Sequence, residues 1–270
     1  METLKHWSLL ALALLLTGCS LPGPAAKGAA ADRLIVFAAA SLTDPFQELA
    51  AQFEAANSGV DVVFNFAGSQ QLAQQLAQGA AVDLFASAND YQMGAAIDAG
   101  RVISGTQRVF AGNKLVVITP VGSPTSLNTL QDLATPGVKI VLAARNVPVG
   151  DYALMFLKKA TTSSQFGAGY DQAVLANVVS YEENVKAVLS KVVLGEADAG
   201  VVYSSDVPPA LLDKVQRIEI PERLNALATY PIAIVADAPN SALAQRFLKF
   251  VLSPEGQAVL AHYGLIPVRE

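Results

Sequence analysis

Five junctions between apolar runs and helical patterns carry hydrogen-bond donors and little formal charge, at residues 38–42, 66–70, 147–152, 183–186 and 201–206. The first turn of a helix has N–H groups without an intrahelical acceptor, and it lies at the positive end of the helix dipole. Anions therefore bind at helix N-termini. Several such turns directed at one point would hold an oxyanion without the help of Lys or Arg.

Short apolar runs alternate with amphipathic segments along the chain, and this alternation predicts an α/β protein with largely parallel sheets. Strands are predicted at residues 34–40, 60–66, 82–87, 115–119, 138–143, 178–180, 199–203, 215–220 and 232–235. Helices are predicted at residues 45–56, 70–77, 91–99, 127–133, 152–159, 185–194, 242–252 and 254–262. Asp44 and Ser69 are the predicted N-caps of the first two helices.

Residues 1–18 have the pattern of a signal peptide, because their apolar run at residues 7–16 is too short to span a bilayer. The run ends in Leu16-Thr17-Gly18-Cys19, which resembles the lipobox of bacterial lipoproteins. That resemblance implies cleavage before Cys19 and a lipid on its sulfur. An ordinary signal peptide followed by an incidental Cys is the alternative. Residues 19–31, which are rich in Ala, Gly and Pro, are expected to form a flexible tether.

The composition argues against several classes of function. The net charge is −5 and no basic patch is visible, so no nucleic-acid partner is expected. A single Cys allows no intrachain disulfide, and no His/Cys cluster offers a zinc or copper site. His262 is the only His after the signal peptide, so Ser41 has no other candidate base and no enzyme activity is expected. The phosphate-binding pattern G-x-x-x-x-G-K-[ST] does not occur in the sequence.

Seven short stretches are spread over nearly the whole mature chain, in this order: VFAAASLT (36–43), FAGS (66–69), DLFASA (83–88), NVPVGDYA (146–153), NV (184–185), GVVYSSD (200–206) and YPIAIV (230–235). Together they resemble the motifs of the molybdate-binding proteins of bacterial ABC importers. The resemblance implies a two-lobe periplasmic-binding-protein fold of type II, with the ligand cleft between the lobes. It places residues 32–113 plus 230–270 in lobe 1 and residues 114–229 in lobe 2.

The same resemblance implies how the ligand is held. The expected donors are hydroxyl and N–H groups of Ser41 and Ser69, the N–H groups of Val149 and Val185, and the hydroxyl of Tyr203. From the residues alone, the usual explanation of the two serines is that they are helix N-caps, and that of the tyrosine is that it is a core residue. Molybdenum would enter only as the bound oxyanion, with no direct metal ligand from the protein and no cofactor.

Five positions near these motifs leave questions open. Gly68 and Gln70 stand where Ser is common in the family, and Val149 stands where Ala is frequent. A backbone donor does not depend on its side chain, so Val149 is compatible with the site. The carboxylates Asp151 and Glu182 are expected on a solvated rim, with coordination of the metal by them as the alternative.

The sequence therefore predicts an extracytoplasmic solute-binding protein, lipid-anchored at the membrane through Cys19 or periplasmic. It would act as a monomer, capture molybdate or tungstate, and deliver it to the permease subunits of an ABC importer. Molybdate at neutral pH has no proton to donate, so its site should contain donors and no carboxylate acceptor. The alternatives are a binding protein for another tetrahedral oxyanion such as sulfate, an enzyme on the same scaffold, and a structural lipoprotein.

Overall fold

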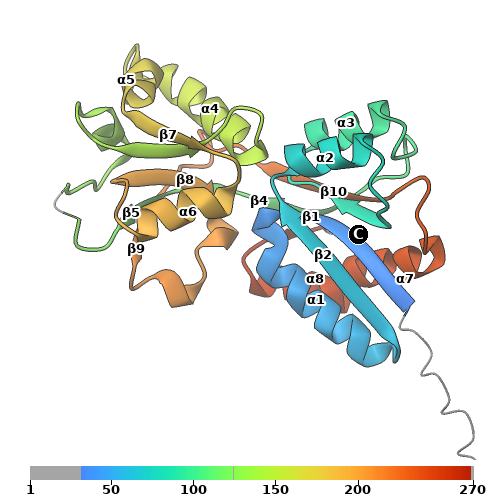
Figure 1. The fold of residues 1–270 in the computed structure, drawn as a ribbon. Coiled ribbons are helices and arrows are strands. Elements are labelled where there is room, and N and C mark those ends of the chain that lie inside the picture. Colours follow the sequence, from blue (N-terminus) through green and yellow to red (C-terminus); the bar gives the residue numbers. More distant parts are fainter. Residues whose placement is uncertain (1–31, 124, 269–270) are drawn as a thin grey trace, which may run out of the picture. The chain divides into compact units, whose positions relative to one another are not determined.

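A computed structural model describes residues 32–123 and 125–268 (Figure 1). Its strands are β1 (Asp32–Ala39), β2 (Val60–Ala67), β3 (Leu84–Ala86), β4 (Arg108–Asn113), β5 (Leu115–Pro120), β6 (Ile140–Ala143), β7 (Val178–Glu182), β8 (Ala199–Tyr203), β9 (Val215–Glu219), β10 (Ala228–Ile234) and β11 (Ile266–Pro267). Its α-helices are α1 (Thr43–Ala56), α2 (Ser69–Ala77), α3 (Asp90–Asp98), α4 (Pro148–Thr161), α5 (Tyr170–Ala176), α6 (Val185–Val193), α7 (Ser241–Leu252) and α8 (Pro254–His262). Short 3-10 helices are η1 (Ala40–Leu42), η2 (Leu130–Ala134), η3 (Ser204–Asp206) and η4 (Pro209–Leu211).

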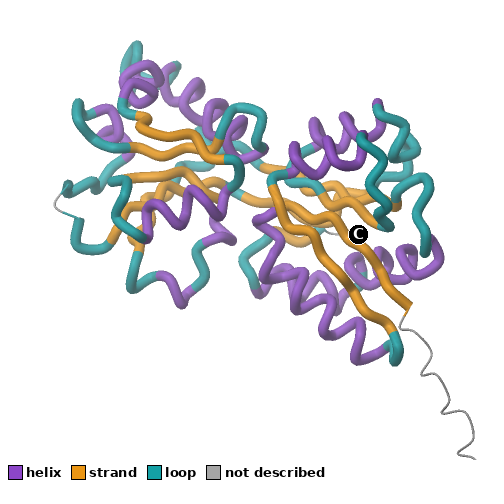
Figure 2. The backbone as a smooth tube through the Cα atoms, in the orientation of Figure 1, coloured by secondary structure: helices purple, strands orange, loops and turns teal. Residues whose placement is uncertain are grey.

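The strands form two sheets, which Figure 2 shows with their helices. The first sheet has the order β11-β4-β10-β3-β1-β2 and combines the start of the described chain with its end. The second has the order β7-β6-β8-β5-β9 and is built entirely from the middle of the chain. The chain leaves the first sheet between β4 and β5 and returns to it at β10. This is the two-sheet arrangement that the predicted lobes require, while their exact bounds stay a prediction.

Both sheets are mixed: most strands in each share one direction, as the prediction of largely parallel sheets requires, and the exceptions were not foreseen. β1 is parallel to β2 and β3, and β6 is parallel to β7 and β8. β10 and β5, however, are antiparallel to both of their neighbours in the respective sheets. The chain reaches each of these two strands directly from the other sheet, without a helix that crosses over the same sheet. Nothing therefore imposes on them the parallel direction that a strand–helix–strand unit requires.

Several element boundaries also differ from the prediction. β4 and α5 were missed, and the helix predicted at residues 127–133 is the 3-10 helix η2. α1 begins at Thr43 after Leu42, so Asp44 is not its N-cap. α4 begins four residues earlier than predicted, with Pro148 in its first turn. Proline is favoured there because its fixed φ suits the helix and its missing N–H is not needed.

Alternation along β8 explains how the second sheet positions a tyrosine. Gly200 lies beneath α6, because a Cβ built on it would be 2.9 Å from the side chains of Val188 and Val192. Side chains three residues apart on a strand point to opposite faces. Tyr203 accordingly faces α4, where its ring packs against the ring of Tyr152 with centroids 6.5 Å apart. β8 is buried along its whole length, so Tyr203 is fixed in place at its C-terminal end.

The predicted signal peptide, Cys19 and the tether lie outside the described residues. Within the part of the chain that the structure covers, no helix has the length and hydropathy of a membrane-spanning segment.

Close packing between β6 and the first turn of α4 yields a stability prediction. A Cβ on Gly150 would lie 2.2 Å from the carbonyl oxygen of Ala144 and 2.5 Å from that of Ala143, whereas a Cβ on Gly94 of α3 would meet nothing within 4 Å. Gly150→Ala should therefore lower the free energy of unfolding by about 1–3 kcal/mol. Gly94→Ala should raise it by about 0.5–1 kcal/mol, since Ala loses less backbone entropy in a helix. Urea denaturation measures both, and equal effects of the two changes would contradict the packing described.

Candidate functional site

One small cavity gathers all five predicted ligand residues. Its walls are Ala39, Ala40, Ser41, Gly68, Ser69, Ala88, Val147, Pro148, Val149, Asn184, Val185 and Tyr203. They include Ala39 at the end of β1 in the first sheet and Tyr203 at the end of β8 in the second. The cavity has a volume of about 20 Å³. A cavity of this size suits a compact ion better than a sugar or a peptide.

Helix starts make up most of the cavity wall. Gly68 and Ser69 open α2, residues 147–149 open α4, and Asn184 and Val185 open α6. The N-cap residues of α2 and α4, Gly68 and Val147, make no side-chain cap bond to the helix. The N–H groups of a first turn have no intrahelical acceptor, so these starts offer donors to whatever occupies the cavity. No Lys, Arg, Asp or Glu is among the lining residues.

Ser69 does not cap its helix, contrary to the prediction. Gly68 occupies the N-cap position, and its N–H donates to Oε1 of Gln71 at 3.1 Å. The Ser69 hydroxyl oxygen instead accepts a hydrogen bond from the N–H of Ala88 at 3.0 Å. Ala88 also lines the cavity and was not among the predicted site residues, although it lies within the DLFASA stretch. The hydroxyl proton of Ser69 is thus left for a partner other than Ala88.

Tyr203 contributes a buried hydroxyl without a partner. The residue is 1% exposed, and its hydroxyl oxygen is one of four buried side-chain atoms within residues 32–123 and 125–268 that lack a hydrogen-bond partner. Burial raises the pKa of Tyr203 well above its ordinary value, so the hydroxyl keeps its proton. An unsatisfied buried donor costs about 1–3 kcal/mol. A ligand that accepts this hydrogen bond would recover that free energy.

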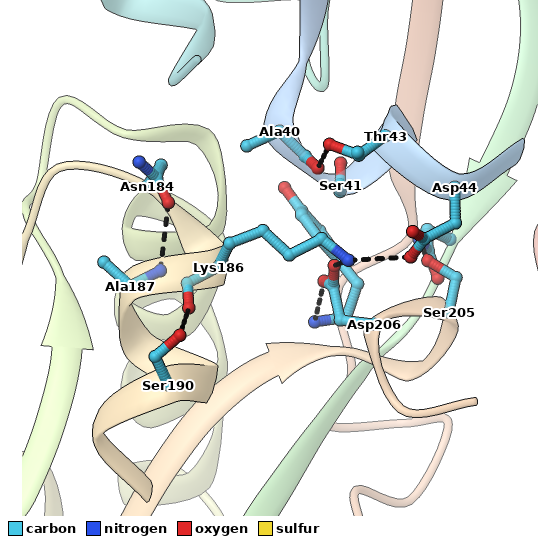
Figure 3. Close-up of polar contacts among 12 residues, drawn as sticks. Ala40, Ser41, Thr43, Asp44, Asn184, Lys186, Ala187, Ser190, Ser205 and Asp206 are labelled. Carbon is cyan, nitrogen blue, oxygen red and sulfur yellow. Dashed lines mark hydrogen bonds and ion pairs between the residues drawn. The ribbon is translucent and has the colours of Figure 1, made fainter. Parts of the chain in front are cut away.

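Lys186, which follows the lining residue Val185 in the sequence, is paired with two carboxylates. Figure 3 shows Lys186 extending from α6 toward Asp44 of α1 and Asp206 of η3. Its Nζ lies 3.0 Å from Oδ2 of Asp44 and 3.6 Å from Oδ1 of Asp206. The pKa of Lys186 is raised: burial alone would lower it, and the two carboxylates outweigh burial. Lys186 therefore links α6 to α1 and η3. It is not among the residues that line the cavity.

Further contacts between elements of the two sheets flank the cavity. Nε2 of Gln70 donates to the carbonyl of Glu183 at 2.8 Å, and Nε2 of Gln71 donates to the Glu183 carboxylate at 2.9 Å. A Cβ on Gly68 would lie 2.5 Å from the carbonyl oxygen of Glu183. Gly68 thus allows a close approach of the two backbones that a side chain at this position would oppose. Gln92 donates similarly to the carbonyl of Asn146 at 2.9 Å.

The carboxylates considered as alternative metal ligands lie elsewhere. Glu182 accepts from Ser180 at 2.5 Å and lies 2.7 Å from Nζ of Lys191. Asp151 lines a separate surface hollow, together with Arg145. Neither borders the cavity that contains Tyr203. Among the described residues, no group of three or more His, Cys, Asp or Glu side chains is placed to hold a metal ion.

Comparison with known proteins gives the family. Residues 34–266 match the bacterial extracellular solute-binding proteins. The chain belongs to this family. The molybdate-binding proteins of Mycobacterium tuberculosis (strain H37Rv) and Escherichia coli (strain K12) are 37% and 34% identical to it, covering 89% and 93% of this chain and 87% and 96% of the relatives. The family resemblance inferred from the motifs is thereby confirmed.

A solved structure confirms the fold class. The sulfate-binding protein of Mycobacterium tuberculosis superposes on this chain with a TM-score of 0.77 at 19% identity, covering 87% of each chain. The two-lobe periplasmic-binding-protein fold of type II is therefore correct. Since this fold also serves a sulfate-binding protein, the fold does not decide which anion is bound.

Asp206 makes the stability of the protein depend on pH. Its carboxylate accepts from the N–H of Tyr203 at 3.2 Å and is 1% exposed. Burial raises its pKa from 3.8 to about 6, against the opposing effect of Lys186. A pKa that is raised on folding contributes stability below the unfolded value, and this contribution is lost as the pH rises through the folded value.

Asp206→Asn should remove this pH dependence. The parent should gain stability relative to the variant as the pH falls from 7.5 to 4.5, by on the order of 1–3 kcal/mol. Denaturant unfolding of both proteins at the two pH values measures the difference. A parent–variant difference that is the same at both pH values would show that Asp206 does not titrate in this window.

Proposed function

We propose that this solute-binding protein captures molybdate, and also tungstate, in the cavity that contains Tyr203, and delivers it to the permease of an ABC importer. The observation that carries the proposal is the partnerless Tyr203 hydroxyl among helix starts, with no charged residue in the cavity wall. A fully deprotonated tetrahedral dianion accepts hydrogen bonds on every oxygen and needs no acceptor in return. Two relatives that are 37% and 34% identical to this chain are molybdate-binding proteins.

The proposed donors are sufficient for tight binding. They are the hydroxyl and N–H groups of Ser41 and Ser69, the N–H groups of Val149 and Val185, and the Tyr203 hydroxyl. Hydrogen bonds to a charged group contribute about 1.5–3 kcal/mol each, so about seven of them give on the order of 10–20 kcal/mol. Ordering of the ligand and of the protein opposes part of this. A sub-micromolar Kd, or about −8 kcal/mol, is therefore expected.

Transport is proposed to use closure of the two lobes. The contacts of Lys186 with Asp44 and of Gln71 with Glu183 join elements of the two sheets beside the cavity, so opening would break them. The chain passes between the sheets near residues 113–115 and again before β10, and we place the hinge there. The lobe bounds, 32–113 plus 230–270 and 114–229, belong to this proposal. So do the signal peptide, the lipid anchor at Cys19, action as a monomer, and the absence of cofactor and enzyme activity.

Selectivity should follow the size and protonation of the anion. Molybdate and tungstate should bind with similar affinity. Sulfate should bind at least about a hundredfold more weakly, because its shorter bonds cannot reach all donors at once, and hydrogen phosphate because its proton finds no acceptor. Binding should change little with salt, since buried dipoles are screened less than surface charges. Calorimetry against the four anions at two ionic strengths measures this, and sulfate binding as tightly as molybdate would favour the sulfate alternative.

Two tyrosine-to-phenylalanine variants should behave in opposite ways. Tyr203→Phe removes a donor to the anion and should weaken molybdate binding about ten- to a hundredfold. It should leave the ligand-free stability unchanged or raised, because the lost hydroxyl has no partner. Tyr170→Phe is the matched control: this buried tyrosine donates to the carbonyl of Leu130, outside the cavity. Its loss should lower stability by about 0.5–1.5 kcal/mol and leave molybdate affinity unchanged.

Thermal unfolding and molybdate titration of both variants complete this test. If Tyr203→Phe bound molybdate as tightly as the parent, the Tyr203 hydroxyl would have no role as a ligand and the proposed site would be wrong.

A further inference from the structure

Tyr230 is buried next to the cavity without lining it. The residue lies on β10 of the first sheet and is 0% exposed. Its hydroxyl lies 3.0 Å from Oγ of Ser41, which does line the cavity, and 3.4 Å from Nδ2 of Asn113. Asn113, also 0% exposed, is the last residue of β4. The Asn113 amide and the hydroxyls of Tyr230 and Ser41 thus form a chain of contacts from three segments, which ends at the Ser41 hydroxyl.

The direction of the hydrogen bonds in this chain is set by Asn113. Its Oδ1 accepts from the N–H of Lys114 at 2.9 Å and from the hydroxyl of Ser204 at 3.3 Å. A backbone N–H can only donate, so the amide oxygen must face Lys114. The NH₂ group of Asn113 must then face the other way, toward the hydroxyls of Ser205, at 2.8 Å, and of Tyr230. Because this NH₂ group only donates, the Tyr230 oxygen accepts from it.

The hydrogen-bond geometry gives the Tyr230 proton the Ser41 oxygen as its acceptor, although the Tyr203 hydroxyl is also near enough to affect the pKa of Tyr230. Burial raises the pKa of Tyr230 above its ordinary value, so the hydroxyl stays protonated at any physiological pH. Its hydrogen-bond contacts are Asn113, which donates to it, and Ser41. The Tyr230 O–H therefore donates to Oγ of Ser41. A serine oxygen that accepts from the protein on one side keeps its own proton for the cavity.

We propose that Tyr230, oriented by Asn113, is a positioning residue that fixes Ser41 as a hydrogen-bond donor to the bound oxyanion. The inference rests on the proposed function and deepens it, because it explains how the site rejects protonated anions. Ser69 has the same arrangement from a different source, since its oxygen accepts from the N–H of Ala88. With both serine oxygens engaged by protein donors, an anion in the cavity meets hydroxyl protons. An oxyanion that carries a proton, such as hydrogen phosphate, finds no acceptor for it.

A double-mutant cycle tests the coupling between Tyr230 and Ser41. Tyr230→Phe should weaken molybdate binding about three- to tenfold in the parent. In the Ser41→Ala background the same change should have no further effect, within about twofold, because Tyr230 acts through Ser41. Tyr170→Phe, with its hydroxyl bound outside the cavity, should leave affinity unchanged in both backgrounds. Isothermal titration measures all affinities, and thermal unfolding without ligand shows whether each variant is folded.

A second variant reverses the direction of the chain. Asn113→Asp at pH 8 provides an ionised carboxylate that accepts the Tyr230 proton, so Tyr230 would in turn accept from Ser41. An oxygen lone pair of Ser41 would then face the anion, and the ratio of molybdate affinity to phosphate affinity should fall at least about tenfold. A residue that only supports the fold would lower both affinities together and leave this ratio unchanged. The Tyr230→Phe cycle decides the proposal alone if Asn113→Asp does not fold.

The outcomes separate this inference from the proposed function. Tight molybdate binding by the parent with non-additive losses at Tyr230 and Ser41 supports both. Additive losses, or unchanged affinity in Tyr230→Phe, would overturn the role of Tyr230 while leaving molybdate binding intact. A parent that binds sulfate in preference to molybdate would overturn the proposed ligand, and the cycle would then be measured with sulfate. A parent that binds none of molybdate, sulfate and phosphate would overturn both.

Discussion

Unsatisfied hydrogen-bond donors around one small cavity are the constraint on which the site depends. Three α-helices begin at one small cavity, and most of their first-turn N–H groups have no acceptor within their own helices, although the Asn184 side chain accepts from the N–H of Ala187 in α6. The Tyr203 hydroxyl adds a buried donor without a partner. Burying such groups costs free energy unless an acceptor enters, so the protein holds a preorganised set of donors that an anion can satisfy. Because the donors are dipoles and not formal charges, their geometry can set both affinity and selectivity.

The fold brings these donors together because the chain passes twice between two sheets. Helices that begin at the cavity belong with both sheets, and β5 and β10 are the first strands after the two crossings. Lys186, whose charge would otherwise attract anions of any shape, is engaged by Asp44 and Asp206. Its charge thereby supports contact between the two sheets. Both serine oxygens also contact protein groups: Ser69 accepts from the N–H of Ala88, and Ser41 lies 3.0 Å from the Tyr230 hydroxyl.

Much of this was predictable from the sequence, and the failures have physical reasons. Apolar runs gave the buried strands, and the motifs identified the five residues that the cavity gathers. The direction of β5 and β10 was missed, because the spacing of apolar residues indicates which face of a strand is buried but not which strands pair with it. Ser69 was misassigned as a cap, since serine at a helix start has the same local pattern whether it bonds its own helix or Ala88. The roles of Ala88, Asn113 and Tyr230 depend on contacts between distant segments, which no local pattern contains.

The most direct test of the central claim is a crystal structure of the protein grown with molybdate. The account predicts one molybdenum peak in the cavity, with the oxyanion within hydrogen-bond distance of the Tyr203 hydroxyl, the Ser41 and Ser69 hydroxyls and the first-turn N–H groups at Val149 and Val185. The contacts of Lys186 with Asp44 and Asp206 should persist in that complex. Molybdenum held by Lys186 or Arg145, or coordinated by Asp151 or Glu182, would contradict a site built from uncharged donors.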